Sequence, residues 1–182
     1  GNALHLDATE ANITYSRITD NGQIGVHIKN FSNVSISQST ISNNGFSVYG
    51  TGIFMTQGST LDVTNSILYS NSYEEDKFEI AFSEAGDPNT VTVSYSNIGS
   101  VETNDNGTID YGDGYISVDP QFVDADNGDY SLMASSPCIN GGNPETELDA
   151  DGTIADMGNS SHLNDYSGPE WHVSQAAGSD LN

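Results

Sequence analysis

Three acidic loops in the C-terminal half carry the residue types best suited to chemistry. Their sequences are NDNGTIDYGDG at 104–114, DADNGD at 124–129, and ELDADG at 147–152, the last continuing to Asp156. Alternating aspartates bounded by glycine suit Ca²⁺, because this ion takes about six to eight hard oxygen ligands and accepts loop carbonyls among them. The preferred ligands are Asp149, Asp151 and Asp156, followed by Asp124, Asp126 and Asp129.

The same loops have a purely structural interpretation. Asp, Asn and Gly are ordinary turn residues that link strands. The EF-hand pattern is not met, because no glutamate stands at the closing position after Asp124 or Asp149. The sequence therefore predicts calcium as a cofactor of at least one loop and leaves the alternative of simple turns open.

Charge is distributed unevenly along the 182 residues, whose net charge is −23. Residues 1–72 carry a net −2 and residues 73–182 a net −21. Such a surface repels nucleic acid and anionic lipid, so both are excluded as partners. No apolar run is long enough to span a membrane. The single cysteine, Cys138, allows no intrachain disulfide and is expected to be a small buried thiol.

Residues able to catalyse polysaccharide cleavage are scarce. A lyase must neutralise a uronate and abstract the adjacent proton, which calls for Arg or Lys near a base, and only Arg17, Lys29 and Lys77 are present. Calcium bridging two anions keeps a lyase open as an alternative. A glycosidase needs two carboxyl groups about 5–10 Å apart. Acids in the rung region are sparse and form no tight cluster; they include Asp7, Asp20, Asp62, Glu79 and Glu84.

Two histidines occupy equivalent places, in Leu4-His5-Leu6 and Val26-His27-Ile28. Alternation along extended strands points both outward, about 4.8 Å apart if the strands are neighbours. Two imidazoles can bind a transition metal, but no third ligand repeats nearby. We therefore expect a surface histidine ladder.

These residues lie within a repeated sequence unit. The pattern [Ile/Val]-[Ser/Thr]-x-Ser-x-[Ile/Leu] occurs as ITYSRI at 13–18, ISQSTI at 36–41, VTNSIL at 63–68 and VSYSNI at 93–98. A shorter alternating apolar segment precedes each copy: LHL, VHI, IFM and IAF. The runs are too short and too rich in β-branched residues for helices, so each unit is predicted to hold two β-runs. One unit cannot bury its apolar face alone, but stacked units form a continuous aliphatic column.

An asparagine ladder is predicted between the units. The third residue after the closing Ile or Leu is Asn21, Asn44 and Asn71 in the first three units, and Val101 in the fourth. Stacked asparagines can bond along the column and satisfy turn amides. An antiparallel β-sandwich is the alternative, but it gives no reason for one hexapeptide to recur with a matching asparagine. The predicted fold class is all-β: a right-handed parallel β-helix (solenoid) with a C-terminal β-rich closing module.

The chain resembles a known family over roughly residues 1–158. The repeats are similar to those of right-handed parallel β-helix proteins of the broad pectate-lyase-like superfamily. The segments VDPQFVDADNGDYSLMASSPCINGGNP at 118–144 and LDADGTIADMG at 148–158 resemble the C-terminal closing module of secreted bacterial members. Ile154 stands where the family often has a basic residue, and Asn159-Ser160 replaces an aromatic. The resemblance implies the architecture and says little about activity.

The last stretch, GPEWHVSQAAGSDLN at 168–182, resembles the opening strand of such a unit. Three parts are therefore expected: rungs over 1–103, an acidic loop-rich closing module over 104–160, and a linker with the opening strand of a following unit over 161–182. The chain starts directly on a rung strand, so its N-terminal solenoid end exposes unpaired backbone groups. Upstream rungs or another protomer are expected to cover that end.

The function predicted from the sequence is non-catalytic. It is that of a module that is extracellular or displayed on the cell surface, for adhesion, glycan binding or structural roles. Loop tyrosines such as Tyr49, Tyr69 and Tyr73 can stack on sugar rings or cover the core. One alternative is a fragment of a polysaccharide lyase or glycosidase whose catalytic rungs lie upstream. The other alternative is a self-assembling fibre or surface-layer unit.

Overall fold

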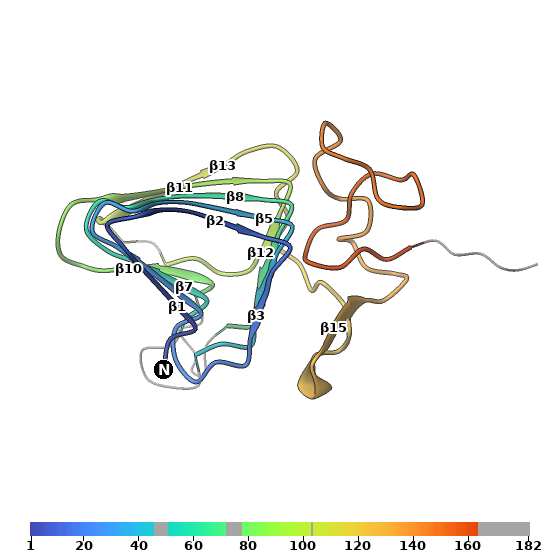
Figure 1. The fold of residues 1–182 in the computed structure, drawn as a ribbon, viewed down its shortest axis with the longest axis horizontal. Coiled ribbons are helices and arrows are strands. Elements are labelled where there is room, and N and C mark those ends of the chain that lie inside the picture. The colour runs from blue at the N-terminus through green and yellow to red at the C-terminus, as the bar shows by residue number, and fades with distance from the viewer. Residues whose placement is uncertain (46–50, 72–77, 103, 164–182) are drawn as a thin grey trace, which may run out of the picture.

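Three parallel sheets build most of the structure, a computed structural model that describes residues 1–45, 51–71, 78–102 and 104–163. Within each sheet, consecutive strands come from successive repeats and pair in parallel. Sheet A contains β1 (Leu4–Asp7), β4 (Val26–Lys29), β7 (Ile53–Met55) and β10 (Ile80–Phe82). Sheet B contains β2 (Glu10–Thr14), β5 (Asn33–Ser37), β8 (Thr60–Thr64), β11 (Asn89–Ser94) and β13 (Gly107–Tyr111). Sheet C contains β3 (Arg17–Thr19), β6 (Thr40–Ser42), β9 (Ile67–Tyr69) and β12 (Asn97–Ile98). The rungs stack into a three-sided solenoid with one sheet on each side (Figure 1).

Each rung holds three strands, one more than the two β-runs expected from the sequence. The hexapeptide splits in two because its third residue turns the backbone between sheets B and C. That residue is Tyr15, Gln38, Asn65 or Tyr95, with φ between 46° and 49° in all four rungs. The alternating pattern survives on both sides of such a corner, so the periodicity alone does not show the break.

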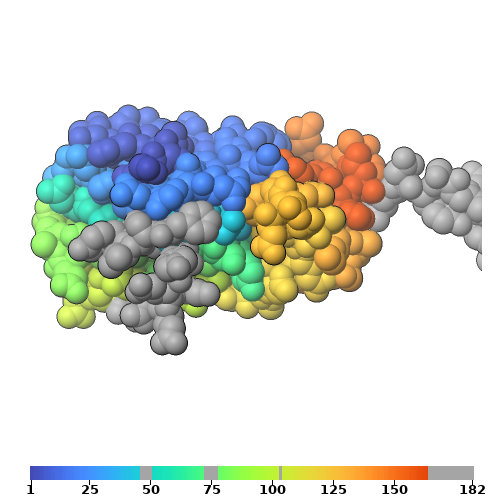
Figure 2. Space-filling model, turned by 90° about the horizontal axis from the view of Figure 1, so that it is seen from below, coloured from blue at the N-terminus to red at the C-terminus, as the bar shows by residue number. Residues whose placement is uncertain are grey.

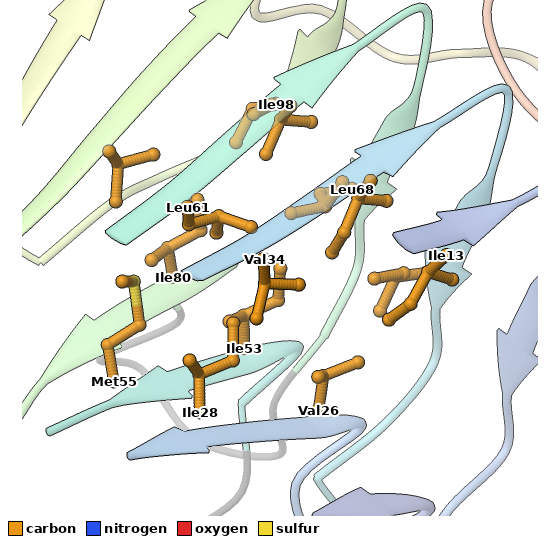
Figure 3. Close-up of a cluster of buried hydrophobic side chains, with 14 of the residues drawn as sticks. Ile13, Val26, Ile28, Val34, Ile53, Met55, Leu61, Leu68, Ile80 and Ile98 are labelled. Atoms are coloured by element: carbon orange, nitrogen blue, oxygen red, sulfur yellow. The ribbon is translucent and has the colours of Figure 1, made fainter. Parts of the chain in front are cut away.

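The core is an aliphatic column that runs through the stack (Figure 3). In sheet A, Val26, Ile53 and Ile80 occupy the same register position on neighbouring strands, and all three are completely buried. Inward positions of sheets B and C add further buried Ile, Val and Leu side chains. This is the interior that the repeat predicts, and the all-β solenoid is confirmed.

The predicted asparagine ladder is present and ends on a carboxylate. Asn44 Oδ1 accepts bonds from the backbone N–H and the amide of Asn21, at 3.2 and 2.8 Å, and Asn71 Oδ1 does the same for Asn44, at 3.1 and 2.8 Å. In the fourth rung, the buried Glu79 carboxylate accepts the backbone N–H and the amide of Asn71. Glu79 therefore completes the ladder that the sequence ended at Val101.

A serine ladder at the corners repeats the same principle. The backbone N–H groups of Ser16, Ser39 and Ser66 each donate to the hydroxyl of the next serine, ending at Ser96, over 3.0–3.2 Å. The serine of the hexapeptide in rungs two, three and four thus satisfies the corner amide of the preceding rung.

The solenoid continues past residue 103, where the sequence placed its end. Strand β13 pairs with β11 and extends sheet B, and Ile116 bridges to Asn97 of β12. The closing module that follows contains one antiparallel hairpin, β14 (Phe122–Asp124) and β15 (Asp129–Leu132), joined by the short helix η1 (Ala125–Asn127). The opening strand predicted within 168–182 lies outside the described residues.

Candidate functional site

The closing module packs against the outer face of sheet C and does not cover an end of the stack (Figures 1 and 2). A second apolar cluster forms there from Ile67 of β9 and Leu132, Cys138 and Met157 of the module. The Cys138 thiol is fully buried, as expected, and burial raises its pKa. The module thus adds a wall along the flank of the solenoid.

Polar side chains on the flank fix the position of this wall. Asn97 donates to the carbonyl oxygen of Val118 at 3.0 Å and accepts the Val118 backbone N–H at 3.1 Å. Asn65 Oδ1 accepts the backbone N–H of Asn143 at 2.7 Å. In rung one, Arg17 donates to the Gly128 carbonyl at 3.2 Å and lies 5.8 Å from the centre of the Tyr130 ring. Contacts from the first to the fourth rung therefore hold the module along the stack.

A groove with polar and apolar lining lies between sheet C and the module. Its first part, about 270 Å³, includes Tyr69 from the rungs and Asp119, Gln121 and Asp126 from the module. Its second part, about 400 Å³, shares Tyr69, Ser70 and Asp119 with the first and continues towards Glu79. We call these two adjoining parts the flank groove. Its lining combines hydroxyl, amide and carboxylate groups with the Tyr69 ring and the apolar side chains of Phe122 and Met133. Such a mixed lining suits a ligand that presents both hydroxyls and apolar C–H faces.

Electrostatics and local bonds define the middle of the flank groove. Burial raises the pKa of the Tyr69 phenol, and the carboxylates of Asp119 and Glu79 raise it further. The phenol is therefore a neutral donor at physiological pH. Asp119 is held in place because its Oδ1 accepts the backbone N–H of Gln121 at 2.8 Å.

The first predicted calcium loop is organised by its own backbone. Asp156 accepts the backbone N–H groups of Asn140 and His162 at 2.7 and 2.6 Å, and its own N–H donates to Asp149 at 3.0 Å. Burial raises the pKa of the Asp156 carboxyl, with Asp149 acting in the same direction, although the two N–H donors oppose the shift. Asp151 accepts the N–H and hydroxyl of Thr153. These hydrogen bonds join several turns of the loop through its aspartate side chains.

The second predicted calcium loop surrounds η1. Asp124 accepts the Asn127 amide at 2.8 Å, Asp129 accepts the N–H of Ser131, and Asp126 lines the flank groove. Across the described ranges, no group of three or more Asp, Glu, His or Cys side chains converges as a metal site. Calcium can still be bound by fewer carboxylates with carbonyls and water, so the calcium site stays a prediction.

The predicted histidine ladder is present on the outer face of sheet A. His5 and His27 are paired in register, with ring centroids 4.9 Å apart and planes 22° from parallel. Phe54 of the next rung extends the stack, 5.5 Å from His27. The Nε2 atom of His27 is buried and has no hydrogen-bond partner. Burial lowers the pKa of His27, and the nearby His5 and Lys29 lower it further, so this imidazole is neutral at pH 7.

An ion pair lies beside these rings. Lys29 Nζ is 3.1 Å from Asp7 Oδ2, and Asn30 donates to Asp7 Oδ1 at 2.6 Å. These partners lower the pKa of Asp7, the Asn30 bond most of all. Rungs one and two thus place a carboxylate (Asp7), an ammonium group (Lys29) and an imidazole (His27) on one face of sheet A. Nothing in the sequence groups these three side chains.

Sequence reasoning identified Tyr69 as a candidate for sugar stacking but missed its partners in the flank groove. Asp119 and Gln121 come from a segment that reads as a turn, Asp119-Pro120, and nothing in their spacing from Tyr69 signals proximity. Tyr49 and Tyr73, the other loop tyrosines considered, lie outside the described residues, as does Lys77.

Comparison with known proteins gives one positive result. The sequence profile of a family described as the right handed beta helix region matches residues 2–119, well over half of the chain. No curated protein and no solved structure matches the chain significantly. In the part of the chain that the structure describes, no helix has the length and apolar character to cross a membrane.

Proposed function

Because the chain belongs to the right-handed β-helix family, we propose that it is a non-catalytic, secreted or surface-displayed module that binds glycans in the flank groove. The observation that carries the proposal is the composition of that groove: the Tyr69 ring lies beside Asp119 and Gln121, with serine hydroxyls along the walls. An aromatic face with flanking polar groups supports sugar binding, because a pyranose presents both apolar C–H faces and hydroxyls.

A glycan array followed by calorimetry tests this proposal. Tyr69→Ala should weaken binding of the best glycan about tenfold, the effect of losing one aromatic contact. The matched control is Tyr15→Ala, which removes an exposed tyrosine at the corner of rung one. Absence of binding to every glycan, or equal losses in both variants, would refute the proposal.

Calcium binding to the acidic loops is a separate part of the proposal. The support is chemical: Asp124, Asp126 and Asp129 lie around one short helix, and Asp149, Asp151 and Asp156 share another loop. Thermal unfolding in millimolar Ca²⁺ and in EDTA tests it. A rise in melting temperature is expected, since a ligand that binds only the folded state stabilises it. An unchanged melting temperature at millimolar calcium would exclude a calcium role.

A carbohydrate-active enzyme is the second candidate. The observation that favours it is the group formed by Asp7, Lys29 and His27 on adjacent rungs of sheet A. In a lyase reaction, Lys29 would offset the charge of a uronate, and the neutral His27 would take the proton next to its carboxylate. The glycosidic C–O bond would then break as the C=C bond forms, and the leaving oxygen would take up a proton from water. Incubation with polyuronates, monitored for the ultraviolet absorbance of an unsaturated product, decides the matter. Product formation that His27→Gln abolishes would establish the enzyme.

Self-assembly is the third candidate and concerns the N-terminal end of the stack. Strands β1, β2 and β3 each lie at the edge of their sheet, and Leu4 is 36% exposed whereas its register partner Val26 is fully buried. A second protomer would cover this edge. Sedimentation at rising protein concentration tests association of this chain with itself. A monomer at every concentration would exclude the second protomer.

A further inference from the structure

The last strand of sheet B leaves the end of the apolar column partly exposed. Ile109 and Tyr111 of β13 are in register with Val91 and Val93 of β11, and both valines are completely buried. Ile109 itself is half-buried, and Tyr111 is 46% exposed. The ring of Tyr115 packs against the core, and its centroid lies 4.3 Å from that of Tyr111. This end of the column therefore presents aliphatic and aromatic side chains to its surroundings.

Strand β13 also forms an open edge of sheet B (Figure 1). Within the described residues it pairs with β11 alone, although the chain continues from it into the closing module. Proteins usually protect an open edge with lysine, proline, a bulge or an inward-pointing charge. β13 has neither Lys nor Pro, its register with β11 is unbroken over five residues, and its one charge, Asp110, is on the exposed face. The strand is therefore available to pair with another strand.

Backbone hydrogen bonds show which residues of β13 face this open edge. The N–H of Asn89 donates to the Asn106 carbonyl oxygen at 3.0 Å, and the N–H of Gly112 donates to the Val93 carbonyl oxygen at 2.7 Å. Backbone groups of successive residues point to opposite sides of a strand, so the even-numbered residues of this segment bond to β11. The odd-numbered residues of β13 point to the open edge: Gly107, Ile109 and Tyr111.

We propose that two copies of this chain pair through β13, antiparallel to each other, about a two-fold axis at Ile109. Pairing over the whole strand places Ile109 opposite its own equivalent and Gly107 opposite Tyr111 of the second copy. These are the positions whose backbone groups face the open edge, so each pair can exchange N–H···O=C bonds. Gly107 has no side chain, so no bulky residue faces the tyrosine across the strands. The exposed ends of the two apolar columns then cover each other.

The outward side chains are compatible with this two-fold pairing. Thr108 lies opposite Asp110 of the second copy at a position without backbone bonds, where side chains approach most closely. The hydroxyl can donate to the carboxylate, and the two copies of Asp110 do not face each other. Asp105 and Asp113 flank the strand, so their negative charge opposes the pairing at low salt. We therefore expect a dimer that salt strengthens.

The β13 dimer is independent of glycan binding and differs from association through the first rung. Association through β1, β2 and β3 would leave β13 unpaired. Stacking of β13 on β2 of another copy would add copies without limit, whereas a two-fold contact closes at two.

Sedimentation velocity of the complete chain tests the proposal, over a wide range of protein concentrations at about 10 mM and about 0.5 M NaCl. The expected result is a monomer–dimer equilibrium that ends at the dimer and shifts towards it in high salt. Monomer alone at every concentration in high salt would overturn the proposal. Species that grow beyond the dimer would overturn it in favour of stacking on β2.

Charge variants locate the contact. Thr108→Lys brings an ammonium group opposite Asp110 twice in the dimer and should tighten the dimer about tenfold, whereas Thr108→Glu should weaken it by a similar factor. The matched control is Thr90→Lys, which makes the same charge change on the same exposed face, one strand further from the edge. Equal effects of Thr108→Lys and Thr90→Lys would show reduced general repulsion and overturn the proposal.

A backbone variant tests strand pairing directly. Ile109→Pro removes an N–H that faces the open edge and keeps the bonds to β11, a position where an edge strand tolerates proline. Ile109→Ala shortens the same side chain and keeps the N–H. Circular dichroism monitors folding of both variants. The proline variant should dimerise at least about tenfold more weakly than the alanine variant. Equal dimerisation of two folded variants would contradict the strand pairing, and if the proline variant does not fold, the Thr108 series decides.

Discussion

The solenoid and the closing module are stabilised in different ways. In the rungs, aliphatic side chains stack on identical positions of the neighbouring rung, and ladders of Asn and Ser satisfy the turn amides. In the module, aspartates and asparagines accept bonds from backbone N–H groups of the module itself, and a small apolar cluster is completed by Ile67 of the solenoid, with Tyr69 of the same strand packed against it. Every rung is stabilised by the same contacts with its neighbours, whereas the module is stabilised by contacts with the outer face of sheet C.

The largest expected effect comes from removing a side chain from the aliphatic column of the solenoid. Ile53→Ala should lower the free energy of unfolding by about 4 kcal/mol, because Ile53 is fully buried between Val26 and Ile80 and its loss leaves a cavity. Urea denaturation measures the change. Thr92→Ala, on the exposed face of sheet B, should change stability by less than about 0.5 kcal/mol. Similar losses in both variants would contradict a stack held by its core.

Removing a side chain from the module cluster should have a local effect. Met157→Ala should lower the free energy of unfolding of the module by about 3 kcal/mol, since Met157 is buried against the outer face of sheet C. Hydrogen exchange should speed up at the amides of Asn140 and His162, which donate to Asp156, and stay unchanged in β8. Met133→Ala, at an exposed module residue, is the control. Faster exchange throughout the solenoid would show that the two regions unfold as one unit.

The ladder prediction compares the middle of the stack with its end. Asn44→Ala should lower the free energy of unfolding by about 2 kcal/mol. Asn44 bonds to both Asn21 and Asn71, so its removal leaves buried polar groups without partners. Asn21→Ala, at the half-buried end of the ladder, should cost less than about 1 kcal/mol. Thermal and urea unfolding provide both values. Equal costs at the two positions would argue against cumulative bonding along the ladder.

The smallest expected effect is a pH dependence of the rungs. The folded pKa of His27 lies below its unfolded value of 6.5, so neutral His27 contributes stability above pH 6.5 that is lost as the pH falls through the folded pKa. Comparing the free energy of unfolding at pH 7.5 and 5.5, His27→Phe should show a smaller decrease than the original chain. Phe54→Leu alters the neighbouring ring and keeps the imidazole, so it should retain the original dependence. An unchanged decrease in His27→Phe would locate the pH sensitivity elsewhere.

The repeat made the solenoid predictable because each local signal agrees with the others. Alternating Val and Ile, the serine of the hexapeptide and the asparagine three residues after it indicate the same stacked arrangement, and the structure confirms it. The third strand per rung was missed because Tyr15 and its equivalents take a left-handed conformation without glycine or proline to mark it. Glu79 was missed as a ladder residue because it reaches Asn71 from a different position in its rung.

By itself, the sequence determined the rungs. Stacked rungs make the same contacts at the same register, so the residues that make them recur at regular intervals along the chain. The sequence also placed the negative charge in the C-terminal half. Only the tertiary structure decided where that charge acts: the module lies along sheet C, and Asp119 comes beside Tyr69, fifty positions earlier in the chain. Contacts between a repeat and a non-repeating segment have no period, so they arise from the fit of two surfaces and leave no pattern to read.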